Sequence, residues 1–188
     1  MKKKSLKKFN PDKVAEIELD TWKAYYKHQF LRLFFLLVHL VHENFGVNYL
    51  VSLRIAFYAA LAASDFRLNK GKEKLERVLK MLINFCRVIS SHSIEPFDYK
   101  KAAELELQWW MIDRYPDRYK ISREEGLALA MAAVYSVEPL KLKDYAKLRA
   151  EAMVLQDEAE NLKNREADWN KIGTLLRDSW RSIYQVIQ

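Results

Sequence analysis

Two glutamates, Glu18 and Glu106, are the residues of this chain whose type and surroundings are best suited to chemistry. In helical geometry each of them shares a face with apolar and aromatic side chains. A carboxylate that faces a protein core costs free energy unless it is paired, hydrogen-bonded, metal-bound or protonated. We therefore treat the two glutamates as candidate buried carboxylates. The aromatic residues expected near them, which could line a pocket, are Trp22, Tyr25, Tyr26, Trp109 and Trp110.

The two glutamates occupy equivalent positions in a repeated octapeptide. The segment AEIELDTW at 15–22 returns as AELELQWW at 103–110, which is 88 residues later. Weaker matches follow in the same order at offsets of 90 to 94 residues. Nearly constant offsets predict a tandem duplication with small loop insertions. The weaker matches are Phe45-Gly46-Val47 with Tyr135-Ser136-Val137, Asp65 with Asp157, and Cys86-Arg87 with Trp180-Arg181.

A metal site is one interpretation of the duplicated carboxylates. Asp65 and Asp157 hold equivalent places in the third helix expected of each half, so a symmetric fold would bring four carboxylates together near its axis. Carboxylate-lined helical bundles bind iron or manganese, and in broad outline this pattern resembles the ferritin-like proteins. The resemblance implies an oxidoreductase. The sequence lacks the Glu-x-x-His motif that those proteins place on two helices.

A second group with metal-ligand chemistry is the H-x-x-H-E pattern formed by His39, His42 and Glu43. His39 and Glu43 are one helical turn apart, so a single ion could use two of the three side chains. The zincin motif instead requires two histidines four residues apart with a glutamate between them. A histidine that packs on an apolar helix and is satisfied by hydrogen bonding is the alternative interpretation.

A structural role is the alternative for the two glutamates. Each could accept hydrogen bonds from a Trp or Tyr, or pair with Arg54, Arg114 or Arg149, and such networks specify packing without any chemistry. An organic-ligand pocket is a third interpretation. No motif fixes a reaction, since a phosphate-binding loop, a dinucleotide fingerprint and a Gly-flanked nucleophile are all missing from the sequence.

Helices are the elements expected to position these residues. Gly and Pro number only four each and half of the residues are hydrophobic, a composition that favours helices, while the 13% of aromatic residues argues against a disordered chain. No segment alternates apolar and polar residues, so we expect no sheet. The sequence predicts an all-α, internally duplicated bundle of about eight helices in two pseudo-symmetric four-helix halves. The expected helices are 11–28, 30–44, 48–68, 72–89, 99–114, 124–135, 141–161 and 167–187.

Local signals add detail to this bundle. Ser122 and Glu125 have the spacing of a capping box. The small-residue runs 59–63 and 127–133 predict helices at the centre of the fold, because small side chains let helix axes approach closely. The apolar stretch LFFLLVHLV at 33–41 is too short to cross a bilayer, which needs about 20 apolar residues, and predicts a buried core helix.

The predicted organisation is a single helical domain at 11–188 behind a basic flexible tail at 1–10. Within the domain, repeat one covers 11–89, a linker covers 90–97, and repeat two covers 98–188. We expect no transmembrane segment and no secretory signal. The single cysteine, Cys86, is expected to be a small core residue, and the absence of an internal disulfide favours a cytoplasmic location.

Five N-terminal lysines dominate the charge. Lys2, Lys3, Lys4, Lys7 and Lys8 supply five of the seven units of net positive charge, which leaves +2 on the rest of the chain. The tail could contact an anionic surface, but nothing predicts a specific nucleic-acid site. The leading expectation is a non-catalytic interaction or scaffold protein that forms a homo-oligomer or binds a protein partner through surplus aromatic surface. The alternative is a carboxylate-lined bundle that binds a divalent metal or a small ligand.

Overall fold

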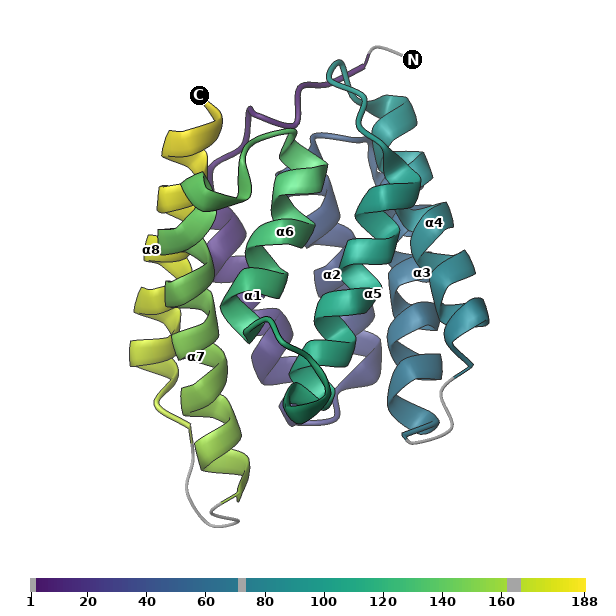
Figure 1. The fold of residues 1–188 in the computed structure, drawn as a ribbon. Helices are drawn as coiled ribbons and strands as arrows, with labels where there is room; N and C mark the ends of the chain where they lie inside the picture. Colours follow the sequence, from purple (N-terminus) through teal and green to yellow (C-terminus); the bar gives the residue numbers. More distant parts are fainter. Residues whose placement is uncertain (1–2, 71–73, 162–166) are drawn as a thin grey trace.

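The computed structural model describes residues 3–70, 74–161 and 167–188, and every regular element in these ranges is helical (Figure 1). The predicted all-α class is confirmed. Eight of the elements are α-helices and two are short 3₁₀ helices. They are α1 (Pro11–Tyr26), α2 (Phe30–Phe45), α3 (Tyr49–Leu68), α4 (Leu75–His92), α5 (Tyr99–Arg114), η1 (Pro116–Arg118), α6 (Arg123–Tyr135), η2 (Pro139–Leu142), α7 (Lys143–Asn161) and α8 (Trp169–Ile187).

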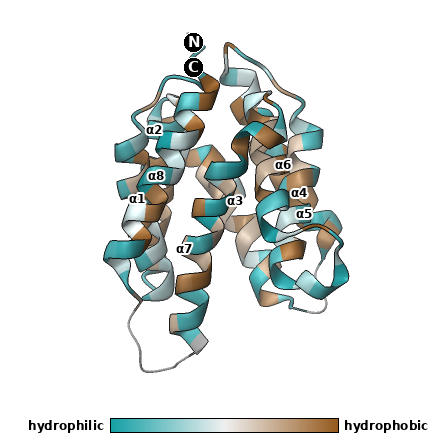
Figure 2. Ribbon diagram, turned by 60° about the vertical axis from the view of Figure 1, so that its left-hand side comes forward, coloured by the Kyte–Doolittle hydropathy of each residue, from teal (hydrophilic) through white to brown (hydrophobic). Residues whose placement is uncertain are grey.

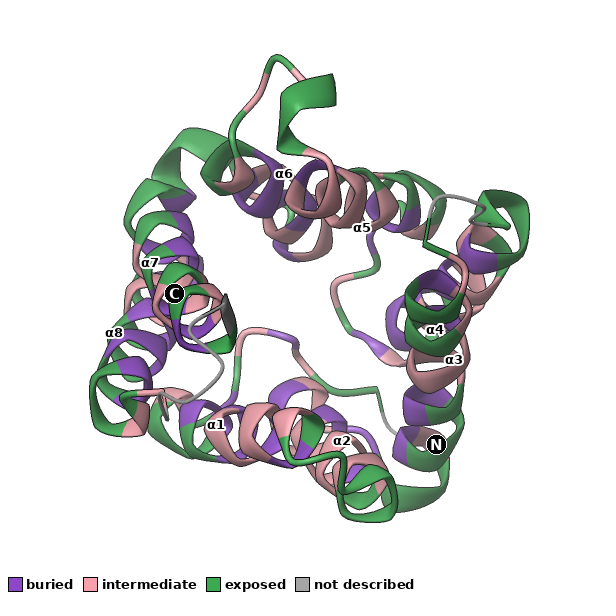
Figure 3. Ribbon diagram, turned by 90° about the horizontal axis from the view of Figure 1, so that it is seen from below, coloured by how far each residue is buried: buried purple, intermediate pink, exposed green. Residues whose placement is uncertain are grey.

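The α-helices form a closed ring. Each α-helix packs on the one before it and the one after it in the sequence, and α8 packs on α1. Seen from below, the ring has four sides made of the pairs α1–α2, α3–α4, α5–α6 and α7–α8 (Figure 3). The first and last helices approach closely at Gly173, where a Cβ atom would lie 2.8 Å from Leu19 Cδ2. A glycine at this position therefore permits the contact that closes the ring.

Most helices have an apolar side and a polar side. Figure 2 shows hydrophobic and hydrophilic residues alternating within most helices. This alternation is expected for helices that turn one apolar face to a common interior. The pattern is clear in α8, whose buried residues recur every three or four positions. These buried positions form a continuous core with those of the other helices. The core members that α8 contributes are Ile172, Leu175, Leu176, Trp180, Ile183 and Ile187.

Several predicted helix ends are confirmed. The break near His28 coincides with a positive φ of 55° at that residue. Ser122 and Glu125 make both hydrogen bonds of the predicted capping box. The linker is shorter than expected because α4 continues to His92. The start expected for the fourth helix at residue 72 lies outside the described residues.

The internal duplication stays a prediction, and two features of the fold agree with it. The helices that carry the repeated octapeptide, α1 and α5, lie on opposite sides of the ring (Figure 3). The equivalent residues Gly46 and Ser136 both end a helix in the left-handed conformation, with φ of 62° and 54°. Helices commonly end in this way, because a left-handed residue lets the following amides reach the last carbonyls.

The N-terminal segment, which we expected to be a flexible tail, packs against the ring in the structure. Residues 4–10 cross the end of the ring at which the chain termini lie (Figure 1). The amide of Lys4 donates to the His92 carbonyl, and the Lys4 carbonyl accepts from the Ile94 amide. Leu6 and Phe9 are buried, with 2% and 8% of their surfaces exposed. These two apolar side chains explain why the segment packs on the ring. The lysines around them predicted a solvated tail, but Leu6 and Phe9 are buried in the core.

Of two expectations about buried helices, one is wrong and the other agrees with the structure for α6 only. The segment predicted to be a buried core helix lies in α2, which buries only Val38, Val41 and Asn44. The small-residue run 127–133 is largely buried in α6, but Ala62 is the only buried residue of the run 59–63 in α3. Both α2 and α3 therefore carry more apolar surface than the ring covers.

The two left-handed helix ends generate a matched prediction. Gly46→Ser should destabilise the protein by about 1 kcal/mol, because a side chain is strained at positive φ. Ser136→Gly should stabilise it by up to about 1 kcal/mol by relieving the same strain. Urea unfolding of both variants measures these effects. Changes of the same sign in the two variants would contradict the prediction.

Candidate functional site

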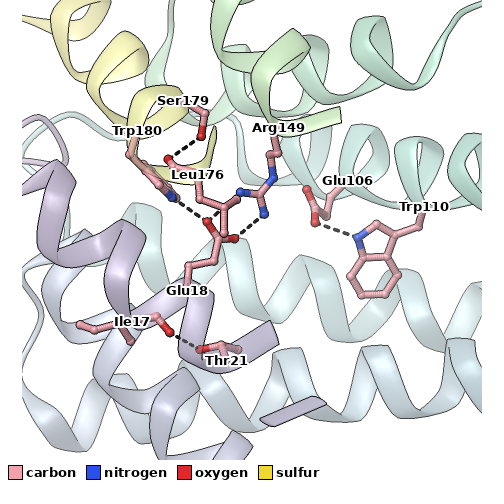
Figure 4. Close-up of polar contacts among 9 residues, drawn as sticks. All are labelled: Ile17, Glu18, Thr21, Glu106, Trp110, Arg149, Leu176, Ser179 and Trp180. Atoms are coloured by element: carbon pink, nitrogen blue, oxygen red, sulfur yellow. Dashed lines mark hydrogen bonds and ion pairs between the residues drawn. The ribbon is translucent and has the colours of Figure 1, made fainter. Parts of the chain in front are cut away.

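The carboxylate of Glu18 stands where three helices meet. Glu18 lies on the inner face of α1 and only 5% of its surface is exposed. Arg149, from α7, donates two hydrogen bonds to it, one from Nη1 to Oε2 at 2.8 Å and one from Nη2 to Oε1. The indole Nε1 of Trp180, from α8, donates to Oε2 at 2.6 Å (Figure 4). The buried charge thus has a bidentate cation and a neutral donor.

The negative charge of Glu18 and the positive charge of Arg149 neutralise each other in the interior. Burial by itself would lower the pKa of Arg149, but the adjacent Glu18 carboxylate outweighs it and raises that pKa. Arg149 therefore stays charged at every pH at which the protein is handled. A permanently charged guanidinium cannot exchange protons, so it holds Glu18 in place and does not serve as an acid or base.

Glu106, on α5, lies on the other side of Arg149 (Figure 4). Its Oε1 accepts a hydrogen bond from Trp110 Nε1 at 2.9 Å. Desolvation raises the pKa of Glu106, although Trp109, Trp110 and the charge of Arg149 each act to lower it. Each glutamate thus has its own indole donor, and Glu18 alone is ion-paired with Arg149. This is the kind of hydrogen-bonded network described by the structural interpretation of the sequence.

The two predicted aspartates lie elsewhere. Asp65 is 2.7 Å from Arg77 Nε, an ion pair between α3 and α4. Asp157 accepts from Arg123 Nη2 at 3.0 Å, and Arg123 Nε is also 2.7 Å from Asp113. The expected meeting of four carboxylates near an axis is therefore wrong. Each aspartate has an arginine from a neighbouring helix, which neutralises it locally.

The histidine motif is also occupied by contacts within the protein. His42 Nδ1 is 2.6 Å from the Val47 carbonyl, and its ring stacks on Tyr49 with centroids 4.1 Å apart. Glu43 accepts from Lys13 Nζ at 2.7 Å, and His39 Nε2 lies 3.4 Å from the same carboxylate. Across the ranges that the structure describes, no group of three or more His, Cys, Asp or Glu side chains is arranged to hold a metal ion.

The candidate pocket aromatics separate into two sets. Trp22, Trp109 and Trp110 are partly buried and pack against the core. Tyr25 and Tyr26 instead line a pocket of about 490 Å³ with residues of α7 and Trp169. Gln156 also lines this pocket, and its buried amide oxygen has no hydrogen-bond partner within the described residues. The five aromatics therefore do not form one stacking platform.

Comparison with protein-family models, with curated proteins and with solved structures finds no match to this chain. The geometry is thus the basis for assigning roles. Sequence reasoning named Arg149 among three possible partners but missed Trp180 as a donor to Glu18. The signal was present, because Trp180 lies on the apolar stripe of the last helix and a buried indole N–H needs an acceptor. Asp113 and Arg123 were missed because their contact joins separate helices.

The buried pair predicts strong coupling between its members. Arg149→Leu should cost about 3–5 kcal/mol, because it leaves the Glu18 carboxylate buried without its cation. Glu18→Leu should cost a similar amount. The double variant should cost about 1–3 kcal/mol less than the sum of the two, since neither charge remains unpaired. Denaturant unfolding of the three variants gives the coupling energy. Additive costs would show that the pair makes no net contribution.

Glu106 predicts a dependence of stability on pH. Its pKa is higher in the folded protein than in the unfolded chain, so the folded state favours the protonated carboxyl. The stability that this carboxyl contributes is present at low pH and is lost as the pH rises through its folded pKa. Glu106→Gln should therefore gain stability relative to the unaltered protein between acidic and neutral pH. Unfolding curves across that range test this, and a constant difference would contradict it.

Proposed function

We propose that this protein is a non-catalytic interaction protein whose docking surface is the outer side of α2 and α3. The observation that carries the proposal is the concentration of exposed apolar side chains on these two helices. A contiguous apolar surface on a protein commonly marks a site of interaction. We call this surface the α2–α3 face, and its exposed members are Phe30, Leu31, Phe35, Leu50, Leu53, Phe57 and Leu68.

The face is continuous along α3. Leu50, Leu53 and Phe57 follow one another at intervals of three and four residues, so they lie on the same side of the helix. Their surfaces are 81%, 44% and 52% exposed. On α2, Leu31 is 74% exposed and Phe35, one turn later, is 61% exposed. Large side chains with this exposure contribute little to the ring itself, which supports a role for them outside it.

A groove continues the face between the two helices. It has a volume of about 540 Å³ and its walls are mainly apolar. From α2 it is lined by Phe30, Leu33, Phe34 and Leu37, and from α3 by Ala60, Ala63, Ser64, Arg67 and Leu68. The groove exists because most of the α3 side chains on one wall are small, while the large α2 side chains form the opposite wall. A groove of this shape suits an apolar group of a partner.

The carboxylates support the non-catalytic part of the proposal. Glu18 is fully engaged by Arg149 and Trp180. Glu106 is hydrogen-bonded to Trp110 beside the same guanidinium. Groups held in this way fix the positions of α1, α5, α7 and α8 relative to one another. The ring then presents the α2–α3 face on a rigid support.

Substitution of the face tests the proposal. The triple variant Leu50→Ser, Leu53→Ser, Phe57→Ser should change the melting temperature by only a few degrees, because exposed side chains contribute little to folding. It should also lose most of the fluorescence of a dye that binds exposed apolar surface, such as anilinonaphthalene sulfonate. Leu140→Ser is the matched control, since Leu140 is 81% exposed on η2, away from the face.

The control should leave both readings unchanged. A triple variant that unfolds would place the three residues in the core and contradict the proposal. Unchanged dye fluorescence in a folded triple variant would show that the face is not an accessible apolar surface.

A further inference from the structure

We propose that the partner of the α2–α3 face is the surface of a bilayer that contains anionic lipids, an inference that rests on the proposed docking function. The face combines exposed apolar side chains with cationic ones. Helices that lie in a membrane interface have this composition, with apolar groups inserted at the level of the acyl chains and basic groups among the headgroups.

The exposed charges of the face are all positive. The exposed charged residues of α2 and α3 are Arg32, Arg54 and Arg67. The two acidic residues of these helices are partly buried and neutralised from neighbouring helices, Glu43 by Lys13 and Asp65 by Arg77. An anionic surface can therefore approach the face without meeting an unpaired carboxylate on either helix.

Further basic residues lie at both ends of the face. At the end where α2 begins and α3 stops, Lys27, Lys70 and Lys74 are exposed. At the other end, the N-terminal segment brings Lys4 against Gly46, between α2 and α3, and Lys4 is also exposed. These lysines add positive charge at both ends of the face, so that long-range attraction and apolar insertion act on the same side of the molecule.

A second copy of this chain fits the face less well. A twofold contact would place the same surface on both partners and bring its arginines toward those of the other copy. Like charges brought together at an interface are strongly unfavourable when no acidic group lies between them. An anionic bilayer satisfies both the apolar and the cationic side chains, whereas self-association satisfies only the apolar ones.

The composition of α3 agrees with this environment. By length and hydropathy, α3 is the one described helix that could cross a membrane, a test that core helices of soluble proteins also pass. Only 28% of its most apolar window is buried within the ring. The same helix contributes Arg54 and Arg67 to the exposed side. We therefore place α3 along the membrane surface, with the ring on the aqueous side.

Vesicle binding of the full chain tests the inference. The probes are vesicles of phosphatidylcholine alone and vesicles in which about one third of the lipid is phosphatidylserine, with bound protein measured by co-sedimentation. The protein should bind the anionic vesicles much more strongly, and added salt should weaken this binding. The triple variant Arg32→Gln, Arg54→Gln, Arg67→Gln should lose about 100-fold in partitioning, since each basic residue near the surface contributes roughly fivefold.

A second triple variant is the matched control. Lys147→Gln, Lys171→Gln and Arg177→Gln remove the same charge from exposed positions on α7 and α8, across the ring from α3 (Figure 3). This variant should retain binding to within about fivefold, because these positions do not touch the surface. Equal losses in the two triple variants would overturn the inference, since net charge and not the face would then determine binding.

Sedimentation velocity without lipid separates the remaining outcomes. A reversible dimer that the variant Leu50→Ser, Leu53→Ser, Phe57→Ser abolishes, together with no vesicle binding, would overturn the lipid partner and leave the docking function in place. Equal binding to neutral and anionic vesicles would overturn the role of the arginines. A monomer that binds no vesicle, and whose dye fluorescence is unchanged in the serine variant, would overturn both proposals.

Discussion

The ring of helices closes where α1 meets α7 and α8, and the Glu18 carboxylate lies at this seam. Its partners, Arg149 and Trp180, are 131 and 162 residues away in the sequence. Seven of the helix contacts join helices that are consecutive in the chain. The contact that closes the ring joins the first and last helices, so the side chains that meet there must determine it. A buried carboxylate accepts few arrangements, because any shift of α7 or α8 leaves a charge or an indole N–H without a partner.

The same constraint applies to the other buried carboxylate of the interior. Glu106 lies on the opposite side of Arg149 from Glu18, close enough for the arginine charge to act on it, so the two glutamates face one arginine in the interior of the ring. Buried ion pairs of this kind contribute more to the choice of one arrangement than to net stability. The surface of α2 and α3 is outside this network and is free to change in composition without affecting how the ring closes.

The parts of the structure that the sequence predicted are those with local causes. The end of α2 follows from Gly46, and the start of α6 follows from the capping box of Ser122 and Glu125. Each of these signals acts within a single helical turn. The burial of Glu18 followed from helical spacing alone. The exposure of α2 could not be predicted in this way, because hydrophobicity does not state which surface covers a helix. The pairing of Asp157 with Arg123 depends on how α6 and α7 cross, which no local pattern encodes.

Ring closure also has a consequence for the order of assembly during synthesis. Contacts between consecutive helices can form as each one leaves the ribosome, since they need only short loops. The seam between α1 and α8 has to wait until α8 has emerged. Until α7 and α8 have both emerged, the inner face of α1 lacks the helices that finally cover it, and the charge of Glu18 is hydrated. A charged residue at that position keeps the exposed face of α1 soluble during synthesis. An apolar residue there would leave a continuous apolar stripe that could aggregate with other chains.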